Sequence, residues 1–205
     1  MFMIGCGADQ NPNPRGTIEI ARQYGKQLAD AVQKVLKMKL DPVRPPFSTY
    51  YTTVDLDFPP LDPEIYQKEI TSSNMGAQKR ANLMLEAYNK GWDVSHYPFP
   101  VQVVRFNNDL TILALSGEIV VDYSLRAKAE YPKENMFVAG YCNEVMCYIP
   151  SRRVLDEGGY EADRSMIGYG FPGPFAGNVE EKVFSAIHLA MKAAGAVTGY
   201  AVKSE

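Results

Sequence analysis

Apolar residues follow two different periods along this chain, and each period predicts a different kind of element. Over residues 17–37 they recur every three or four positions, which predicts an amphipathic helix. Over residues 50–58 they alternate with polar residues, which predicts a strand, and we place it at a sheet edge. The expected buried side chains of this strand are Tyr51, Val54, Leu56 and Phe58.

A β-hairpin is the clearest strand pair in the sequence. Residues 101–106 and 110–115 are apolar runs that flank the turn Asn107-Asn108-Asp109. The second run is apolar almost throughout, so we expect both of its faces to be covered. Two further apolar runs, at residues 1–4 and 136–139, are predicted as strands.

Start signals define the remaining helices. Asp62 followed by Pro63 predicts a helix start, and a second helix is expected over residues 76–89. We interpret residues 59–91 as a peripheral helical insertion. Helices are also predicted over 119–130 and from Asn178 to about 194, where Asn178 and Glu181 resemble a capping box. The expected fold class is α/β or α+β, a mixed sheet covered by helices.

Composition narrows the function classes. The chain has 205 residues, 46% of them hydrophobic and 22% charged, and a net charge of -3. These values are typical of a globular domain, and no basic run favours nucleic acid as a partner. No apolar run reaches the roughly 18 residues that cross a bilayer, and we read no secretory leader, so the compartment stays open. Because the sequence opens directly in an apolar run, we expect it to be the C-terminal portion of a larger catalytic domain.

The candidate chemistry lies in residues 136–175. This stretch opens as a buried strand and then gathers acids, arginines, the amide of Asn143 and four phenols, those of Tyr141, Tyr148, Tyr160 and Tyr169. Long polar excursions from a sheet are often functional. The alternative is a surface excursion whose tyrosines pack on the core.

Other candidate residues are scattered. Glu118 follows the strand of residues 110–115, where it either favours the positive end of the next helix or serves as a metal ligand or base. His96 and His188 each stand alone. The three cysteines, Cys6, Cys142 and Cys147, show neither metal-knuckle spacing nor a disulfide framework, and we expect the last two to be buried fillers.

Three stretches together resemble the catalytic domain of neutral/alkaline non-lysosomal ceramidases, and in particular their shorter bacterial relatives. Residues 7–13 (GADQNPN) are similar to the family's Gly-Asp-Val-Ser-Pro-Asn loop, and Ser116-Gly117-Glu118 to its Pro-Gly-Glu turn. Residues 139–143 (AGYCN), 148–151 (YIPS) and 160–161 (YE) are similar to its Ala-Gly-x-x-Asn, Tyr-Val/Ile-Thr-Thr and Tyr-Glu segments. These stretches occur in the family's order and span most of the chain.

The resemblance implies a zinc-dependent hydrolase of amide bonds that converts ceramide to sphingosine and fatty acid. It carries two zinc ligands onto Glu118 and Tyr148, a catalytic phenol onto Tyr160, and a substrate-binding position onto Asn143. Asp9 and Asn11 would shape the catalytic loop. Asn11 replaces the family's serine, and an amide cannot act as a nucleophile, so ceramide itself is a doubtful substrate.

The family's two histidine ligands have no counterpart in matching motifs here. A catalytic zinc site usually has three protein ligands, so we expect the N-terminal half of the same enzyme to supply the others. Two alternatives remain open: a non-catalytic remnant that binds a lipid or sugar, or a hydrolase of a different amide or ester. The family's members are often secreted or periplasmic.

Overall fold

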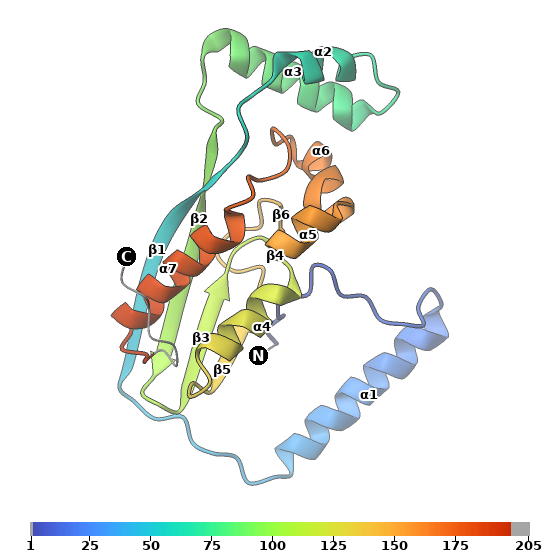
Figure 1. Cartoon of the computed structure of the whole chain (residues 1–205). Coiled ribbons are helices and arrows are strands. Elements are labelled where there is room, and N and C mark those ends of the chain that lie inside the picture. The colour runs from blue at the N-terminus through green and yellow to red at the C-terminus, as the bar shows by residue number, and fades with distance from the viewer. Residues whose placement is uncertain (1, 198–205) are drawn as a thin grey trace.

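A four-stranded mixed sheet forms the centre of the molecule (Figure 1). The computed structural model describes residues 2–197. The strands, in sheet order, are β1 (Phe47–Asp57), β2 (His96–Phe106), β3 (Leu110–Leu115) and β5 (Met136–Ala139). The first three are antiparallel neighbours and β5 is parallel to β3. The predicted edge strand, hairpin and mixed fold are therefore confirmed.

A second, two-stranded parallel ladder continues from the ends of β3 and β5. It joins β4 (Glu118–Ile119) to β6 (Tyr148–Ile149). Gly117, at the turn between β3 and β4, has φ 69°. A Cβ on Gly117 would lie 2.7 Å from Ile149 Cγ1 and 2.9 Å from the Cys147 carbonyl oxygen. Only glycine therefore fits where the two strands meet.

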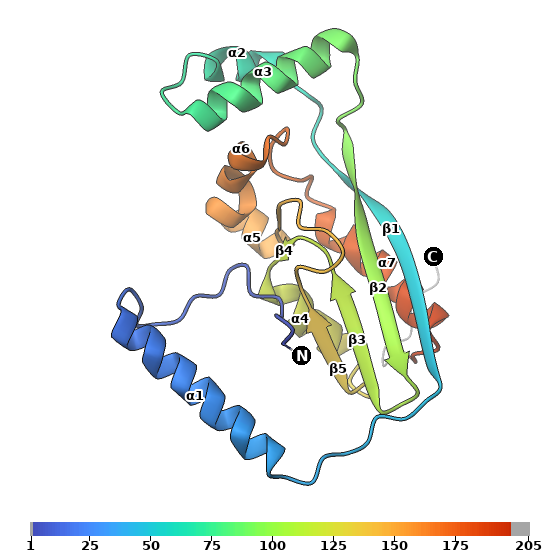
Figure 2. The same cartoon turned by 180° about the vertical axis from the view of Figure 1, so that it is seen from behind.

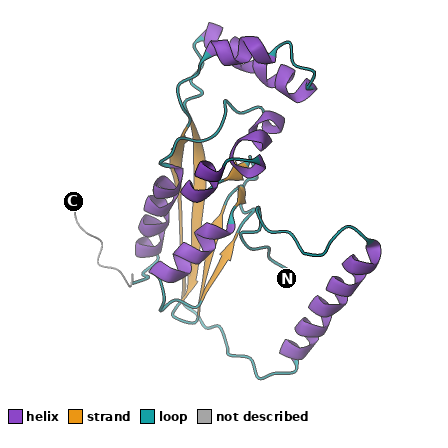
Figure 3. Ribbon diagram, turned by 45° about the vertical axis from the view of Figure 1, so that its right-hand side comes forward, coloured by secondary structure: helices purple, strands orange, loops and turns teal. Residues whose placement is uncertain are grey.

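Helices cover one face of the main sheet (Figures 1 and 3). The helices of the described residues, not all of which lie on the sheet, are α1 (Ile18–Leu36), α2 (Pro63–Glu69), α3 (Met75–Lys90), α4 (Val121–Glu130), α5 (Arg152–Glu157), the π-helix η1 (Tyr160–Arg164), α6 (Ser165–Tyr169) and α7 (Val179–Ala193). Of these, α7 contacts β1 and β2, and α4 contacts β5.

The main core lies between this covered face and the helices. Alternate residues of the strands face it, and they are completely or almost completely buried: Leu56, Phe99, Val101, Val103, Leu113, Leu115 and Val138. From α7 they meet Val183, Phe184, Ile187 and Met191, all fully buried. Burial of this apolar surface is the main source of stability.

The other face of the sheet differs from expectation. It is turned toward the viewer in Figure 2, where no helix within residues 2–197 crosses it. On that side Leu110 and Ile112 are half-buried and Ala114 is buried, so within the described residues the expected cover on both faces of β3 is found only near the end of the strand. Tyr51 is 53% exposed, and the buried face of β1 is the one that carries Val54 and Leu56.

The N-terminal segment is not a strand. Residues 2–4 are exposed coil, and the chain touches the sheet through a bridge between Gly5 and Ala139 and a 3.2 Å hydrogen bond from Gly140 N to Ile4 O. Met1 lies outside the described residues. An apolar run alone does not supply a strand partner, and the bridge to β5 is made at its last residue, Ala139.

Helix α1 has the predicted bounds, with the Thr17 side chain accepting from Ile20 N at 3.3 Å. None of its residues is buried, and it stands apart from the sheet (Figures 1 and 2). No helix of residues 2–197 is long and apolar enough to cross a membrane.

Helices α2 and α3 pack on each other beyond one end of the β1–β2 pair (Figure 1). Tyr66, Ala81 and Met84 form a small core of their own, separate from the main one. The predicted Asp62 cap is present, since its Oδ1 accepts from Glu64 N at 2.9 Å. Helix α3 also contacts α6, which links this pair to the candidate chemistry.

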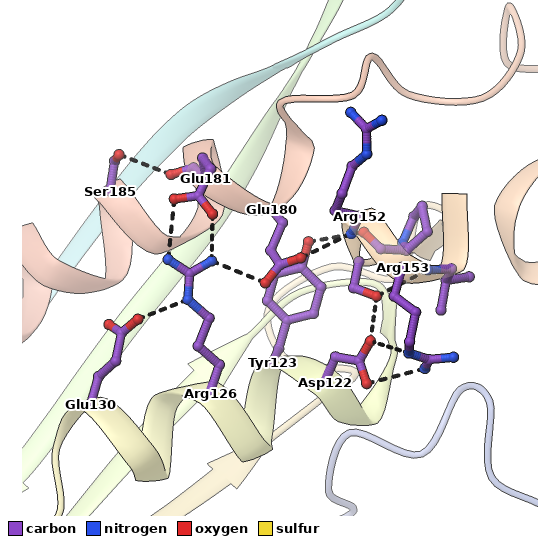
Figure 4. Close-up of polar contacts among 12 residues, drawn as sticks. Asp122, Tyr123, Arg126, Glu130, Arg152, Arg153, Glu180, Glu181 and Ser185 are labelled. Carbon is purple, nitrogen blue, oxygen red and sulfur yellow. Dashed lines mark hydrogen bonds and ion pairs between the residues drawn. The ribbon is translucent and has the colours of Figure 1, made fainter. Parts of the chain in front are cut away.

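The predicted capping box at the start of α7 is wrong, because tertiary partners take both side chains. Asn178 Nδ2 donates to Asp57 Oδ2 at 3.0 Å, and Glu181 accepts from Arg126 at 2.6 Å. Arg126 also binds Glu180 and Glu130 (Figure 4). Its guanidinium lies 3.9 Å from the centre of the Phe184 ring. This cluster ties α4 to α7.

We predict that Gly117→Ala destabilises the protein by at least about 2 kcal/mol, because the new Cβ clashes at a left-handed φ. Chemical denaturation measures the free energy of unfolding. The matched control is Gly168→Ala in α6, where a Cβ meets nothing within 4 Å. An equal loss in both variants would contradict the close approach at Gly117.

Candidate functional site

Backbone hydrogen bonds bring the β3–β4 turn against the loop after β5. Gly117 N donates to Glu144 O at 2.7 Å, and Glu118 N donates to Cys147 O at 2.8 Å. In the resulting ladder Glu118 is the register partner of Tyr148. Register partners project from the same face of a ladder, so the two side chains predicted as zinc ligands lie beside each other.

Phenols surround the Glu118 carboxylate. Tyr169 donates its hydroxyl to Oε1 at 2.5 Å, and Tyr141 donates to Oε2 at 3.4 Å. The rings of Tyr148 and Tyr160 meet edge to face, with 5.4 Å between their centres. The four tyrosines of the polar excursion therefore gather with one acid, contributed by β4, β6, η1, α6 and the loop after β5.

Burial and the Glu118 carboxylate both raise the pKa values of three of these phenols. Burial is the larger cause and the carboxylate the next, and together they raise the pKa values of Tyr148, Tyr169 and Tyr141. Both effects disfavour the phenolate. The protein alone therefore keeps these hydroxyls protonated, as hydrogen-bond donors.

The loop after β5 holds two residues in the left-handed region, Tyr141 at φ 57° and Asn143 at φ 61°. For Tyr141 this conformation accompanies the hydroxyl contact with Glu118. The Asn143 side chain is exposed and, within the described residues, makes no hydrogen bond. Its predicted role in substrate binding is untested.

Asp9 has a structural contact that sequence reasoning did not anticipate. Its Oδ1 accepts from Val121 N, at the first residue of α4, at 2.9 Å. Its Oδ2 lies 3.6 Å from Arg153 Nη2. Asp9 thus satisfies a free backbone donor at a helix start, where a negative charge is favourable.

Asn11 is exposed and accepts a 2.5 Å hydrogen bond from Arg15. No contact among the described residues joins Asn11 to Glu118 or Tyr148. The structure thus leaves its predicted catalytic role without support from geometry.

Beside the ladder, Arg153 binds both oxygens of Asp122 at 3.0 and 3.1 Å (Figure 4). The Ser151 hydroxyl also donates to Asp122, at 2.5 Å. Burial opposes ionisation of this acid, but the Arg153 and Ser151 hydrogen bonds outweigh it and lower the pKa of Asp122. The pairing fixes α5 on α4 directly after β6.

The histidines are engaged elsewhere. His188 Nε2 lies 2.6 Å from Glu130 Oε2, and His96 lies 3.7 Å from Asp93. Within residues 2–197 no three His, Cys, Asp or Glu side chains gather into a group that could hold a metal. Glu118 and Tyr148 supply oxygen donors suited to part of a zinc shell. The described residues leave that shell incomplete.

Cys142 and Cys147 were both expected to be buried, and this is confirmed for Cys147 alone. All three are free thiols, Cys6 and Cys147 are buried, and Cys142 is half-buried. Burial raises the pKa values of Cys6 and Cys147 to about 12. Neither is poised as a nucleophile.

Sequence reasoning identified Glu118, Tyr148 and Tyr160 but gave no role to Tyr141 or Tyr169. Their only signal was membership of a phenol-rich segment. A scan of the chain against protein-family models finds no match, and a search of curated proteins finds none either. The ceramidase resemblance therefore stays a hypothesis that depends on the motifs.

We predict that Glu118→Gln lowers the pKa values of Tyr148, Tyr169 and Tyr141 toward the ordinary phenol value. With these raised pKa values, the folded protein keeps protons that the unfolded chain loses above about pH 10. The free energy of unfolding is therefore highest below that pH and falls as the pH rises above it, toward the raised pKa values of the folded protein. Glu118→Gln should reduce this loss.

Near-ultraviolet absorbance measures tyrosinate against pH, and alkaline denaturation measures the stability change. Glu86→Gln, an exposed acid paired with Lys90 on α3, is the control. Identical tyrosinate curves for Glu118→Gln and wild type would show that the carboxylate does not act on these phenols.

We also predict that Asp9→Ala costs about 1 kcal/mol of folding stability, since it removes the acceptor at the start of α4. Asn11→Ala, in the same loop, should change stability by less than about 0.5 kcal/mol. Urea denaturation compares the two. Equal effects would contradict the assignment of Asp9 to α4.

Proposed function

We propose that this chain forms part of a zinc-dependent hydrolase of amide bonds of the ceramidase-like kind. The observation that carries the proposal is the register pairing of Glu118 with Tyr148. Two residues that the resemblance assigns to one metal are distant in sequence and adjacent in space. The family-model and curated-protein searches add no support, so the proposal depends on the motifs and this geometry.

Each nearby side chain has a definite part in this proposal. Glu118 and Tyr148 would hold zinc, and histidines from a segment outside this chain would complete the shell. Bound zinc would lower the pKa of a water molecule and polarise the amide carbonyl. Tyr169 and Tyr141 orient the Glu118 carboxylate through their hydrogen bonds.

Tyr160 is the candidate donor to the substrate. Its side chain is 50% exposed, and its ring contacts that of Tyr148. A phenol there can donate a hydrogen bond to charge that develops on the amide oxygen. Asp9 supports the site indirectly by fixing the N-terminal loop to α4, directly after β4.

A second candidate is a non-catalytic domain that binds a lipid or sugar. The observation that favours it is that both Glu118 oxygens already accept phenol hydrogen bonds. Such a carboxylate is satisfied without a metal. Exposed aromatic rings such as that of Tyr160 would then contact the ligand directly.

A zinc titration distinguishes the two candidates, with tyrosinate absorbance near neutral pH as the readout. A phenol that binds a cation loses its proton, which reverses the raised pKa of Tyr148. We expect zinc at millimolar concentration to produce tyrosinate in wild type and Glu86→Ala, and not in Tyr148→Phe or Glu118→Ala.

An absence of zinc-induced tyrosinate, or a signal that persists in both Tyr148→Phe and Glu118→Ala, would refute the zinc site and leave the binding domain. Circular dichroism of each variant checks that the fold is retained.

A further inference from the structure

A cavity of about 380 Å³ lies between the start of α3 and the segment η1–α6. Asn74 and Gly76 line it from the α3 side. Tyr160, Arg164 and Ser165 line it from the other side. Figure 1 shows α6 beneath the α2–α3 pair, and α3 contacts α6. The cavity therefore adjoins Tyr160, the phenol beside Tyr148.

The charged residue that lines the cavity is Arg164, which is exposed. Arg164 takes part in no ion pair within residues 2–197, and the acids of the same π-helix, Glu161 and Asp163, do not line the cavity. The N-terminus of α3 adds a positive dipole end. The N–H groups of Gly76 and Ala77 already donate to Asn74 Oδ1, at 2.8 and 3.2 Å. The start of α3 therefore contributes a positive electrostatic potential, but these two donors are not free to bind a ligand.

Ser165 adds an independent sign of a ligand. The residue is 3% exposed, and its hydroxyl has no hydrogen-bond partner among residues 2–197. Buried hydroxyls in folded proteins ordinarily find a partner. A hydroxyl without one, in a residue that lines the same cavity as Arg164, is suited to an acceptor that arrives from outside the protein.

We propose that this cavity binds the anionic group, a carboxylate or a phosphate, of a small molecule that reaches Tyr160. Arg164 supplies the charge and two parallel N–H donors, and Ser165 supplies a hydroxyl. As a statement about the substrate, this inference rests on the proposed hydrolase: the amide would carry a negative group. As a binding site, it stands independently of zinc.

The test uses the whole chain in the presence of a chelator, with three probes: N-acetylglycine, its neutral amide N-acetylglycinamide, and inorganic phosphate. Isothermal titration gives the affinities, and backbone amide shifts at Ser165 and Gly168 locate the binding. We expect N-acetylglycine, phosphate or both to bind at this cavity, and the neutral amide to bind at least about tenfold more weakly than the better anion.

Variants assign the contacts. Arg164→Gln should weaken anion binding at least about tenfold, while Arg22→Gln on the exposed helix α1 should leave it unchanged. Ser165→Ala should weaken it severalfold without loss of folding, whereas a hydroxyl buried without a ligand role would leave affinity unchanged.

Binding of phosphate alone supports a phosphorylated ligand, and binding of N-acetylglycine supports a carboxylate. Equal affinity for the charged and neutral acetylglycine probes without phosphate binding, or equal affinities of Arg164→Gln and Arg22→Gln, would overturn the proposal. Because no zinc is present, this result is distinct from failure of the hydrolase proposal.

Discussion

The two-residue ladder between β4 and β6 determines how the rest of the candidate site is arranged. Alternation along each short strand sends Ile119 and Ile149 into the core, both fully buried, and leaves Glu118 and Tyr148 on the opposite side. Such a short ladder has few hydrogen bonds of its own. Burial of the isoleucines and the close fit at Gly117 hold it in register.

Much of this arrangement was predictable because it is local. The hairpin, the strand at Met136–Ala139 and the starts of α1 and α2 depend on period, turns and caps within a few residues. Glu118 was recognisable as an acid just after an apolar strand. Its pairing with Tyr148 came from the motif resemblance, and the polar excursion after β5 carried the phenols that surround it.

The rest depends on partners that no local pattern specifies. The face of β1 that is buried is set by α7, so Tyr51 is exposed where a buried residue was expected. Asn178 binds Asp57 instead of capping its own helix, and Asp9 serves α4. The hydrogen bond from Tyr169 to Glu118 joins residues that are far apart in the sequence. Arg164, which makes no ion pair within the described residues, indicates a binding site only because it lines a cavity.

The central claim is that Glu118 and Tyr148 converge on one metal position. Anomalous diffraction at the zinc edge, from crystals of the chain grown with zinc, tests it most directly. The account predicts a peak about 2.0–2.2 Å from a Glu118 carboxylate oxygen and close to the Tyr148 hydroxyl. Zinc bound only at other residues, with Glu118 still held by Tyr169 and Tyr141, would contradict it.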